Sequence, residues 1–202
     1  MMRKTTLVLV LFLSVLSSVW SMGTMESASS SNSVTTTVTG NVDDLEVQWK
    51  YGAVKIQFGE YDEITVTTNG EEVLIEENDG TLIVESNEER PSDLVICVPE
   101  SLPIQRLVFN GGVGEAELVG VNSKSVEVYA NVMDVKCSFS VVPERLLYKT
   151  GTGDASIVFP GTDSLVVTAP FGLGGRDIAD RFIVKKESSL HIEVSVGNLV
   201  VQ

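Results

Sequence analysis

Two stretches of the chain repeat one pattern: GGVGEAELVG at residues 111–120 and TGTGDASIVF at residues 150–159. Each contains Gly-x-Gly, then an acidic residue, an alanine and, two residues on, an aliphatic residue. A dinucleotide loop needs a third glycine and a following helix, and a P-loop needs Lys-Ser/Thr. A calcium-binding β-roll needs aspartate where Ala116 and Ala155 stand. The pattern therefore indicates the corner of a repeated structure.

Apolar residues recur at fixed distances from these corners. Leu107 and Phe109 precede Gly114 by seven and five residues, and Ala116 and Leu118 follow it by two and four. The same template fits around Gly52, Glu71, Met133, Gly153, Gly174 and Gly197, and a unit at 82–96 fits with a longer corner containing ERPSD. The units therefore begin near residues 45, 64, 82, 107, 126, 146, 167 and 190.

Apolar and polar residues alternate with period two almost to the end of the chain, which predicts an all-β protein. Self-similarity at about 20 residues predicts a parallel β-helix or β-solenoid of about eight coils. Glycine supplies the positive φ that sharp corners need, so the predicted structural corner glycines are Gly52, Gly114, Gly153, Gly174 and Gly197. The residue before the corner is often apolar and is expected to fill the corner from inside; these residues are Tyr51, Val113, Val132, Leu173 and Val196.

A second fold stays open. TTNGEE, at residues 67–72, is also typical of a tight hairpin turn between Ile64 and Ile75. Such hairpins would build an antiparallel β-sandwich, although hairpins do not require units of one length. The sandwich is therefore the alternative to the solenoid.

The N-terminus has the pattern of a signal peptide. A basic MMRK is followed by the apolar LVLVLFLSVL, and Val19 and Ser21 suit a cleavage site. We predict a signal peptide at 1–21, a flexible linker at 22–35 and a single domain at 36–202. The protein is then exported, with periplasmic, cell-surface and secreted locations all open.

Charge and composition narrow the partners. The net charge of −14 disfavours nucleic acid and anionic membrane surfaces. Residues 60–89 carry many carboxylates and no base, which indicates a solvated face or, alternatively, a site for a divalent cation or basic partner. Cys97 and Cys137 lie in apolar alternating runs, which favours buried free thiols, although an exported protein can pair them. No cofactor or metal is predicted.

Three residues are candidates for special roles. His191 is the only histidine and is expected to point outward, too isolated for catalysis or metal binding. Arg176 falls at an inward position, so either a bulge at 174–175 turns it to solvent or it forms a site with Asp177, Asp180 and Arg181. Trp49 lies near a corner, where it is either partly buried or exposed for stacking on a sugar.

The run LVICVPESLPIQRLVFNGGVGEAELVGV (94–121) and the ending LHIEVSVGNLVVQ (190–202) resemble the putative-adhesin domains of bacterial envelopes. This family of unknown function is related to the auto-transporter-adhesin-like head domains. The resemblance covers about residues 40–202 and implies an exported, β-helical protein. It supplies no catalytic residues, and the ERPSD corner and Arg176 depart from its regular pattern.

These observations favour a non-enzymatic envelope or surface protein, an adhesin or binding scaffold for a protein or glycan. The alternatives are a polysaccharide-active β-helix enzyme, which needs long loops and converging carboxylates, and a structural or assembly module of the envelope. The last coil at 190–202 is expected to expose unpaired strand edges, with residues 34–40 covering the opposite end. Homo-oligomer formation through this C-terminal coil is therefore also predicted.

Overall fold

The computed structural model describes residues 33–69, 73–86 and 92–202. The predicted signal peptide and residues 22–32 of the predicted linker lie outside the described residues, and the first strand already begins at Ser33. The described residues contain no helix, and hence none that is long and apolar enough to cross a membrane. They form sixteen strands: β1 Ser33–Val38, β2 Asp44–Gly59, β3 Ile64–Asn69, β4 Val73–Asn78, β5 Thr81–Ser86, β6 Leu94–Pro99, β7 Arg106–Val121, β8 Ser125–Phe139, β9 Arg145–Thr152, β10 Ala155–Val158, β11 Leu165–Val167, β12 Phe171–Leu173, β13 Arg176–Ile178, β14 Phe182–Val184, β15 Leu190–Val196 and β16 Leu199–Val201.

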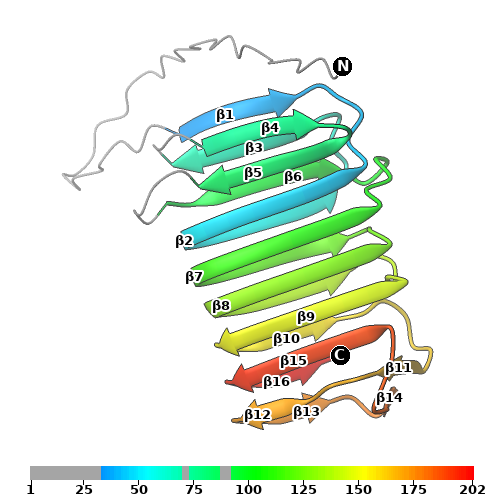
Figure 1. Ribbon diagram of the computed structural model, residues 1–202. Coiled ribbons are helices and arrows are strands. Elements are labelled where there is room, and N and C mark those ends of the chain that lie inside the picture. Colours follow the sequence, from blue (N-terminus) through cyan, green and yellow to red (C-terminus); the bar gives the residue numbers. More distant parts are fainter. Residues whose placement is uncertain (1–32, 70–72, 87–91) are drawn as a thin grey trace, which may run out of the picture. The chain divides into compact units, whose positions relative to one another are not determined.

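Fourteen of these strands form one mixed sheet, and β11 and β14 form a second, two-stranded sheet. In the large sheet, seven segments of the chain lie side by side with parallel pairing, and we call each of them a rung (Figure 1). A rung is either one long strand or two consecutive shorter strands. In spatial order the rungs are β5 with β6, β2, β7, β8, β9 with β10, β15 with β16, and β12 with β13.

The pairing keeps the repeat of the sequence in register. Leu107 lies opposite Val126, Val126 opposite Leu146, and Leu146 opposite Leu190. All four side chains are buried, as is Val167 of β11, whose neighbour Thr168 bridges in parallel to His191, so the predicted inward column is confirmed. An alternating chain gains this burial only when its neighbour presents apolar residues at the same positions.

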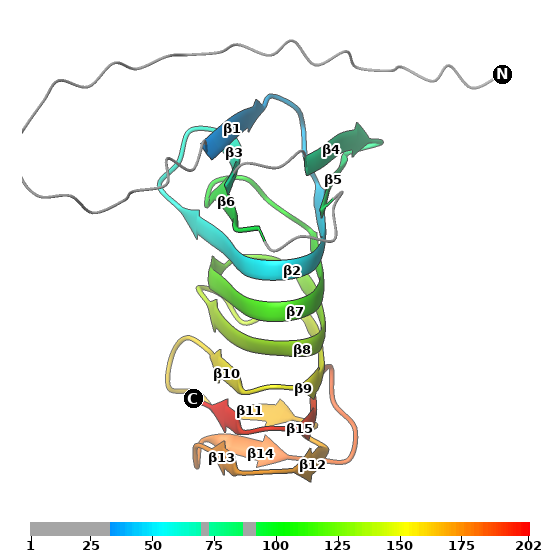
Figure 2. The ribbon, with the colours of Figure 1, turned by 90° about the vertical axis from the view of Figure 1, so that its left-hand side faces the viewer.

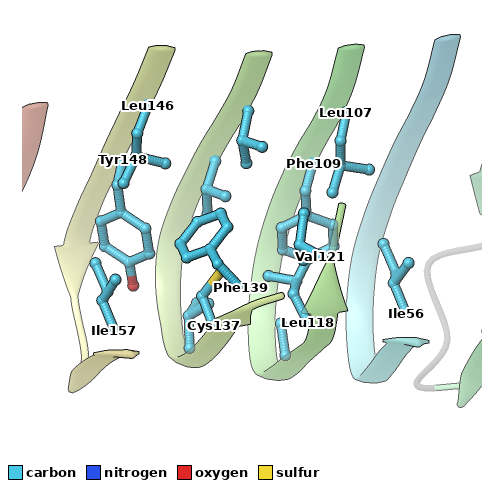
Figure 3. Close-up of a cluster of buried hydrophobic side chains, with 14 of the residues drawn as sticks. Ile56, Leu107, Phe109, Leu118, Val121, Cys137, Phe139, Leu146, Tyr148 and Ile157 are labelled. Atoms are coloured by element: carbon cyan, nitrogen blue, oxygen red, sulfur yellow. The ribbon is translucent and has the colours of Figure 1, made fainter. Parts of the chain in front are cut away.

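Each rung bends at its corner, so that its two halves lie in different layers (Figure 2). In β2 the pattern of burial continues on both sides of the bend, with Leu45 and Val47 before it and Val54 and Ile56 after it. Figure 3 shows the equivalent side chains of successive rungs pointing into one interior between the layers. The core is therefore a stack of apolar layers, one from each rung.

The corner glycines have the expected conformation. The φ angles are positive at all five predicted positions: Gly52 (114°), Gly114 (142°), Gly153 (137°), Gly174 (137°) and Gly197 (144°). Side chains are excluded there by close approach as well, since a Cβ on Gly114 would lie 2.0 Å from the carbonyl oxygen of Gly52. Met133 occupies the same register position without a positive φ, and its side chain is buried.

The unit at 64–75 does not follow the template. β3 pairs antiparallel with β1 and β6, and β4 pairs antiparallel with β5. The expected coil around Glu71 is therefore wrong, and so is the hairpin between Ile64 and Ile75, because these two strands pair with different partners. Antiparallel pairing is confined to β1, β3, β4, β5 and β6, so an antiparallel sandwich does not describe the rest of the sheet.

The spatial order of the rungs differs from their order in the chain at both ends. β2 lies between the β5–β6 rung and β7, and the β15–β16 rung lies between β9–β10 and β12–β13 (Figure 1). Residues 190–202 therefore do not expose unpaired edges, because β15 pairs with β9 and β12, and β16 pairs with β10 and β13. The expected bare strand edge, on which the predicted association through this coil rested, is therefore wrong. At the opposite end, β1 (Ser33–Val38) is the outermost strand of its layer, as expected, but it reaches the first rung through β3 and does not pair with it directly.

Candidate functional site

The outer surface of the corners carries the most regular arrangement of exposed side chains. Parallel pairing without a shift places residues of equal template position beside one another, about 4.8 Å apart from rung to rung. Two positions at the corner are exposed in nearly every rung, one residue before and one residue after the corner residue. Each position forms a continuous column of side chains across the rungs.

The column before the corner is apolar and points outward. Tyr51 pairs with Val113, Val113 with Val132, and Val132 with Thr152; beyond Thr152 follow Val196 and then Leu173. We call these six residues the apolar column. The expectation that they fill the corner from inside is wrong, because the five apolar members are between 38% and 73% exposed. Two consecutive outward residues precede each corner, as at 131–132, and this breaks the alternation.

The column after the corner is acidic in its middle rungs. Glu115 pairs with Asp134, and the next rung places Asp154 beside Asp134. All three carboxylates are exposed, as expected for Glu115 and Asp154, and we call them the acidic column. The position two residues further on carries Lys55, Glu117 and Lys136 in register, with Lys55 and Glu117 forming an ion pair of 3.0 Å. The negative charge is thus compensated there but not in the acidic column.

Hydrogen bonds connect the corners. The backbone N–H of Asp154 donates to Asp134 Oδ1 at 2.8 Å, and the backbone N–H and side-chain amide of Asn198 donate to Asp154 Oδ1 at 2.8 and 2.9 Å. The N–H of Gly175 in turn donates to Asn198 Oδ1 at 3.0 Å. Asp154 is therefore part of the corner structure, and no such bond involves the carboxylate of Glu115 among the described residues.

A shallow hollow of about 400 Å³ lies on the other side of the apolar column. Its polar lining comes from four rungs: Asn110, Tyr129, Asn131, Lys149, Glu193 and Ser195. Lys149 Nζ lies 3.4 Å from Glu193 Oε2, so the two charges of the hollow compensate one another. Burial and, after it, the hydrogen bond that Tyr129 donates to Glu127 raise the pKa of Tyr129 above its usual value. The phenol therefore stays neutral and polar at physiological pH.

The special residues singled out in the sequence are distributed over different parts of the molecule. His191 points outward, half-buried, with Nε2 3.5 Å from Glu193 Oε2. Arg176 is exposed, which agrees with its turning to solvent. Trp49 is only 2% exposed and donates from Nε1 to the carbonyl of Ser92 at 3.1 Å, which removes it as a platform for a sugar.

Among the described residues, the thiols and the acidic segment form no further site. Both Cys97 and Cys137 are free; Cys137 is buried, and burial raises the pKa of its thiol far above the usual value, whereas Cys97 is only half-buried. Arg181 donates to the carbonyl oxygens of Phe159 and Gly161 and lies over the ring of Phe182, so it has a structural role. Within 33–69, 73–86 and 92–202, no group of three or more His, Cys, Asp or Glu side chains has the geometry to hold a metal ion.

Comparisons with known proteins place the fold. The chain is similar to the crystal structure of a putative cell adhesion protein from Clostridium sporogenes, with a TM-score of 0.61 and 17% identity over 84% of this chain and 98% of that one. A putative adhesin from Bacteroides fragilis aligns with a TM-score of 0.44 and 10% identity over 86% of this chain and 98% of that one. At this level of identity the first likeness shows a shared fold alone. No protein-family model and no curated protein matches the chain.

Proposed function

We propose that the protein is an exported, non-enzymatic binding scaffold of the bacterial envelope, built as a β-solenoid. The observation that carries this proposal is the pair of in-register columns on the outer corners: an apolar one that spans six rungs with Thr152 as its one polar member, and an acidic one that spans three. An exposed apolar surface of this length is typical of a site for a macromolecule.

Two further observations support the proposal. The fold is shared with the putative cell adhesion protein from Clostridium sporogenes. The hydrogen bonds between corners hold the outer surface in one geometry, so binding there requires little ordering of the protein. Signal-peptide removal at 1–21 and a single solenoid domain at 36–202 belong to the same proposal, with the final location periplasmic, cell-surface or secreted.

The solenoid part of the proposal is tested by removing one coil. Ser125 and Arg145 are register partners, so deleting residues 125–144 joins Lys124 to Arg145 and leaves every later residue at its template position. We expect this variant to fold and unfold cooperatively with reduced stability, because a solenoid's stability is a sum over units and their interfaces. Deleting only residues 125–134 shifts the register and should prevent folding. A deletion of 125–144 that fails to fold would contradict the solenoid.

The binding function is tested with the purified protein on a solid support. Envelope extract from the native bacterium is passed over wild-type protein and over an unrelated acidic protein coupled in the same way, and retained protein and glycan are analysed separately. Specific retention by the wild type alone is the expected result. The protein is also incubated with a panel of polysaccharides, and new reducing ends are measured. Cleavage of any polysaccharide would show an enzyme and contradict the non-enzymatic function.

A further inference from the structure

The apolar column is the longest exposed apolar feature that the rungs build. Its exposed fractions are 38% at Tyr51, 42% at Val113, 46% at Val132, 43% at Val196 and 73% at Leu173. Scattered single apolar residues are ordinary on a protein surface, but these five are joined by direct strand pairing, with only Thr152 between them. The column therefore presents an apolar line across six rungs that is interrupted only at Thr152.

The charge beside this line selects the partner. Glu115 lies two residues after Val113, and Asp134 two residues after Val132, so the acidic column runs parallel to the apolar one on the same outer surface. These carboxylates are exposed, and among the described residues none of them forms an ion pair, whereas Glu117 at the neighbouring position is paired with Lys55. A partner with basic groups flanking an apolar line complements both columns at once. A second copy of the chain, with a net charge of −14, brings acid against acid instead.

The spacing of the column selects the partner's conformation. The rungs repeat every 4.8 Å or so, whereas same-face side chains of an extended strand repeat at roughly 6.7 Å and fall out of step within two rungs. One turn of an α-helix rises about 5.4 Å, so a helix laid along the column places an apolar residue near each rung. Six rungs span about 24 Å, which corresponds to roughly 16 helical residues.

We propose that the apolar column, with the acidic column beside it, is the docking surface for a basic amphipathic helix of a partner protein. This inference rests on the proposed binding function and specifies its partner class. The helix lies along the stack with apolar residues at i, i+3, i+4 and i+7 on the column. Its lysine or arginine residues lie on the flank that faces Glu115, Asp134 and Asp154.

The test uses a defined probe and variants that retain the fold. The probe is a 17-residue peptide with leucine at the i, i+3, i+4 and i+7 positions and lysine along one flank; the control peptide carries glutamate in place of lysine. The protein variant is Val113→Thr, Val132→Thr and Val196→Thr combined, because Thr152 already occupies the same column in the native chain. Leu74→Thr, 42% exposed on β4 and outside the column, is the matched control.

Titration followed by fluorescence anisotropy should show binding of the lysine peptide to the wild type and to Leu74→Thr. The triple variant should bind at least about tenfold more weakly, and Glu115→Gln should weaken binding and reduce its dependence on salt. Equal binding by the triple variant, equal binding of the glutamate peptide, or no binding of the lysine peptide would each overturn the inference. So would a dimer in solution that the triple variant dissociates, since the occupant would then be a second copy.

The binding function and the docking surface can be contradicted separately. If the triple variant still retains its envelope ligand on the solid support, the binding function stands and the docking surface is wrong. If neither the wild type nor the variant retains any envelope component, the function itself is wrong, whatever the peptide does.

Discussion

The two ends of the rung stack are built differently. At the N-terminal end, the β5–β6 rung is followed by three antiparallel strands of six residues each: β1 and β3 extend one layer, and β4 extends the other. At the C-terminal end, the last rung consists of β12 and β13, which have three residues each. No strand of the large sheet lies beyond this rung among the described residues.

Both ends carry unpaired strand edges, which can pair with strands of other molecules and cause association. At the N-terminal end, one edge strand, β4, carries Glu76 and Glu77, whereas the other edge strand, β1, is uncharged. At the C-terminal end the strands are very short, and Gly174 and Gly175 separate β12 from β13, which begins with the exposed Arg176 and Asp177. The comparison teaches that a parallel stack can end either by a change of strand direction or by a loss of strand length.

The largest expected effect is a difference in stability between substitutions in the middle of the stack and at its N-terminal edge. Leu107→Asp places a carboxylate at a fully buried position between two rungs. We expect it to lower the free energy of unfolding by more than about 4 kcal/mol, because the charge has no partner there. Leu74→Asp, the same change at 42% exposure on β4, should stay within about 0.5 kcal/mol. Urea unfolding of both variants measures the difference, and equal losses would contradict the assignment of β4 to an exposed edge.

The next prediction compares the loss of amide protection after deletion of a C-terminal segment and of an N-terminal segment. Deleting residues 190–202 removes the rung that both β9–β10 and β12–β13 pair with, so the last rung loses its partner. Deleting residues up to 38 removes only the edge strand β1. Hydrogen exchange should show lost protection in β9 and throughout 165–184 after the first deletion, and loss confined to β3 after the second.

A result in which the first deletion affects only its immediate edge would favour a C-terminal coil at the end of the stack. The mass of the protein in solution provides a second readout for this deletion. The newly exposed edges of β9 and β10, which are eight and four residues long, should promote association more than the six-residue edge of β3 that the loss of β1 exposes.

Much of the arrangement of the rungs was predictable from the sequence. Positions such as Leu107, Val126, Leu146 and Leu190 follow from alternation and from a fixed distance to the corner, and those are local properties of the chain. The direction of pairing was not predictable at 64–75, because a period of two is the same for parallel and antiparallel strands. Ile64 and Val66 are buried as the template requires, but against antiparallel neighbours.

The spatial order of the rungs and the candidate site were also beyond the sequence. Every rung presents the same apolar template, so nothing local says that 190–201 inserts beside 146–157 instead of following 167–178. The apolar column was visible as a recurrent apolar residue before the corner, but strict alternation assigned it to the interior. The signal that distinguishes the two is the pair of consecutive outward residues at each corner, which only the backbone of the bend determines.

A smaller effect concerns the hydrogen bonds that tie the last rungs together. Asp154→Ala removes the acceptor of two hydrogen bonds from Asn198, so we expect a loss of about 1–2 kcal/mol in the free energy of unfolding. Glu115→Ala, in the same column one rung beyond Asp134, should change it by less than about 0.5 kcal/mol. Chemical denaturation of the pair tests this, and equal sensitivity would show that the corner bonds do not stabilise the C-terminal rungs.

The smallest expected effect has the opposite sign and lies in the middle of the stack. Tyr148 is fully buried, and its hydroxyl has no hydrogen-bond partner among the described residues. Burial raises the pKa of this phenol well above its usual value, so the group is neutral, but its desolvation still costs free energy. Tyr148→Phe keeps the ring in the core and removes the unsatisfied oxygen, which should raise the free energy of unfolding by about 1 kcal/mol. The matched change Trp49→Phe removes a donor that is satisfied by Ser92 and should lower it. A Tyr148→Phe variant that is less stable than the wild type would mean that a buried water or another group completes the phenol's hydrogen bond.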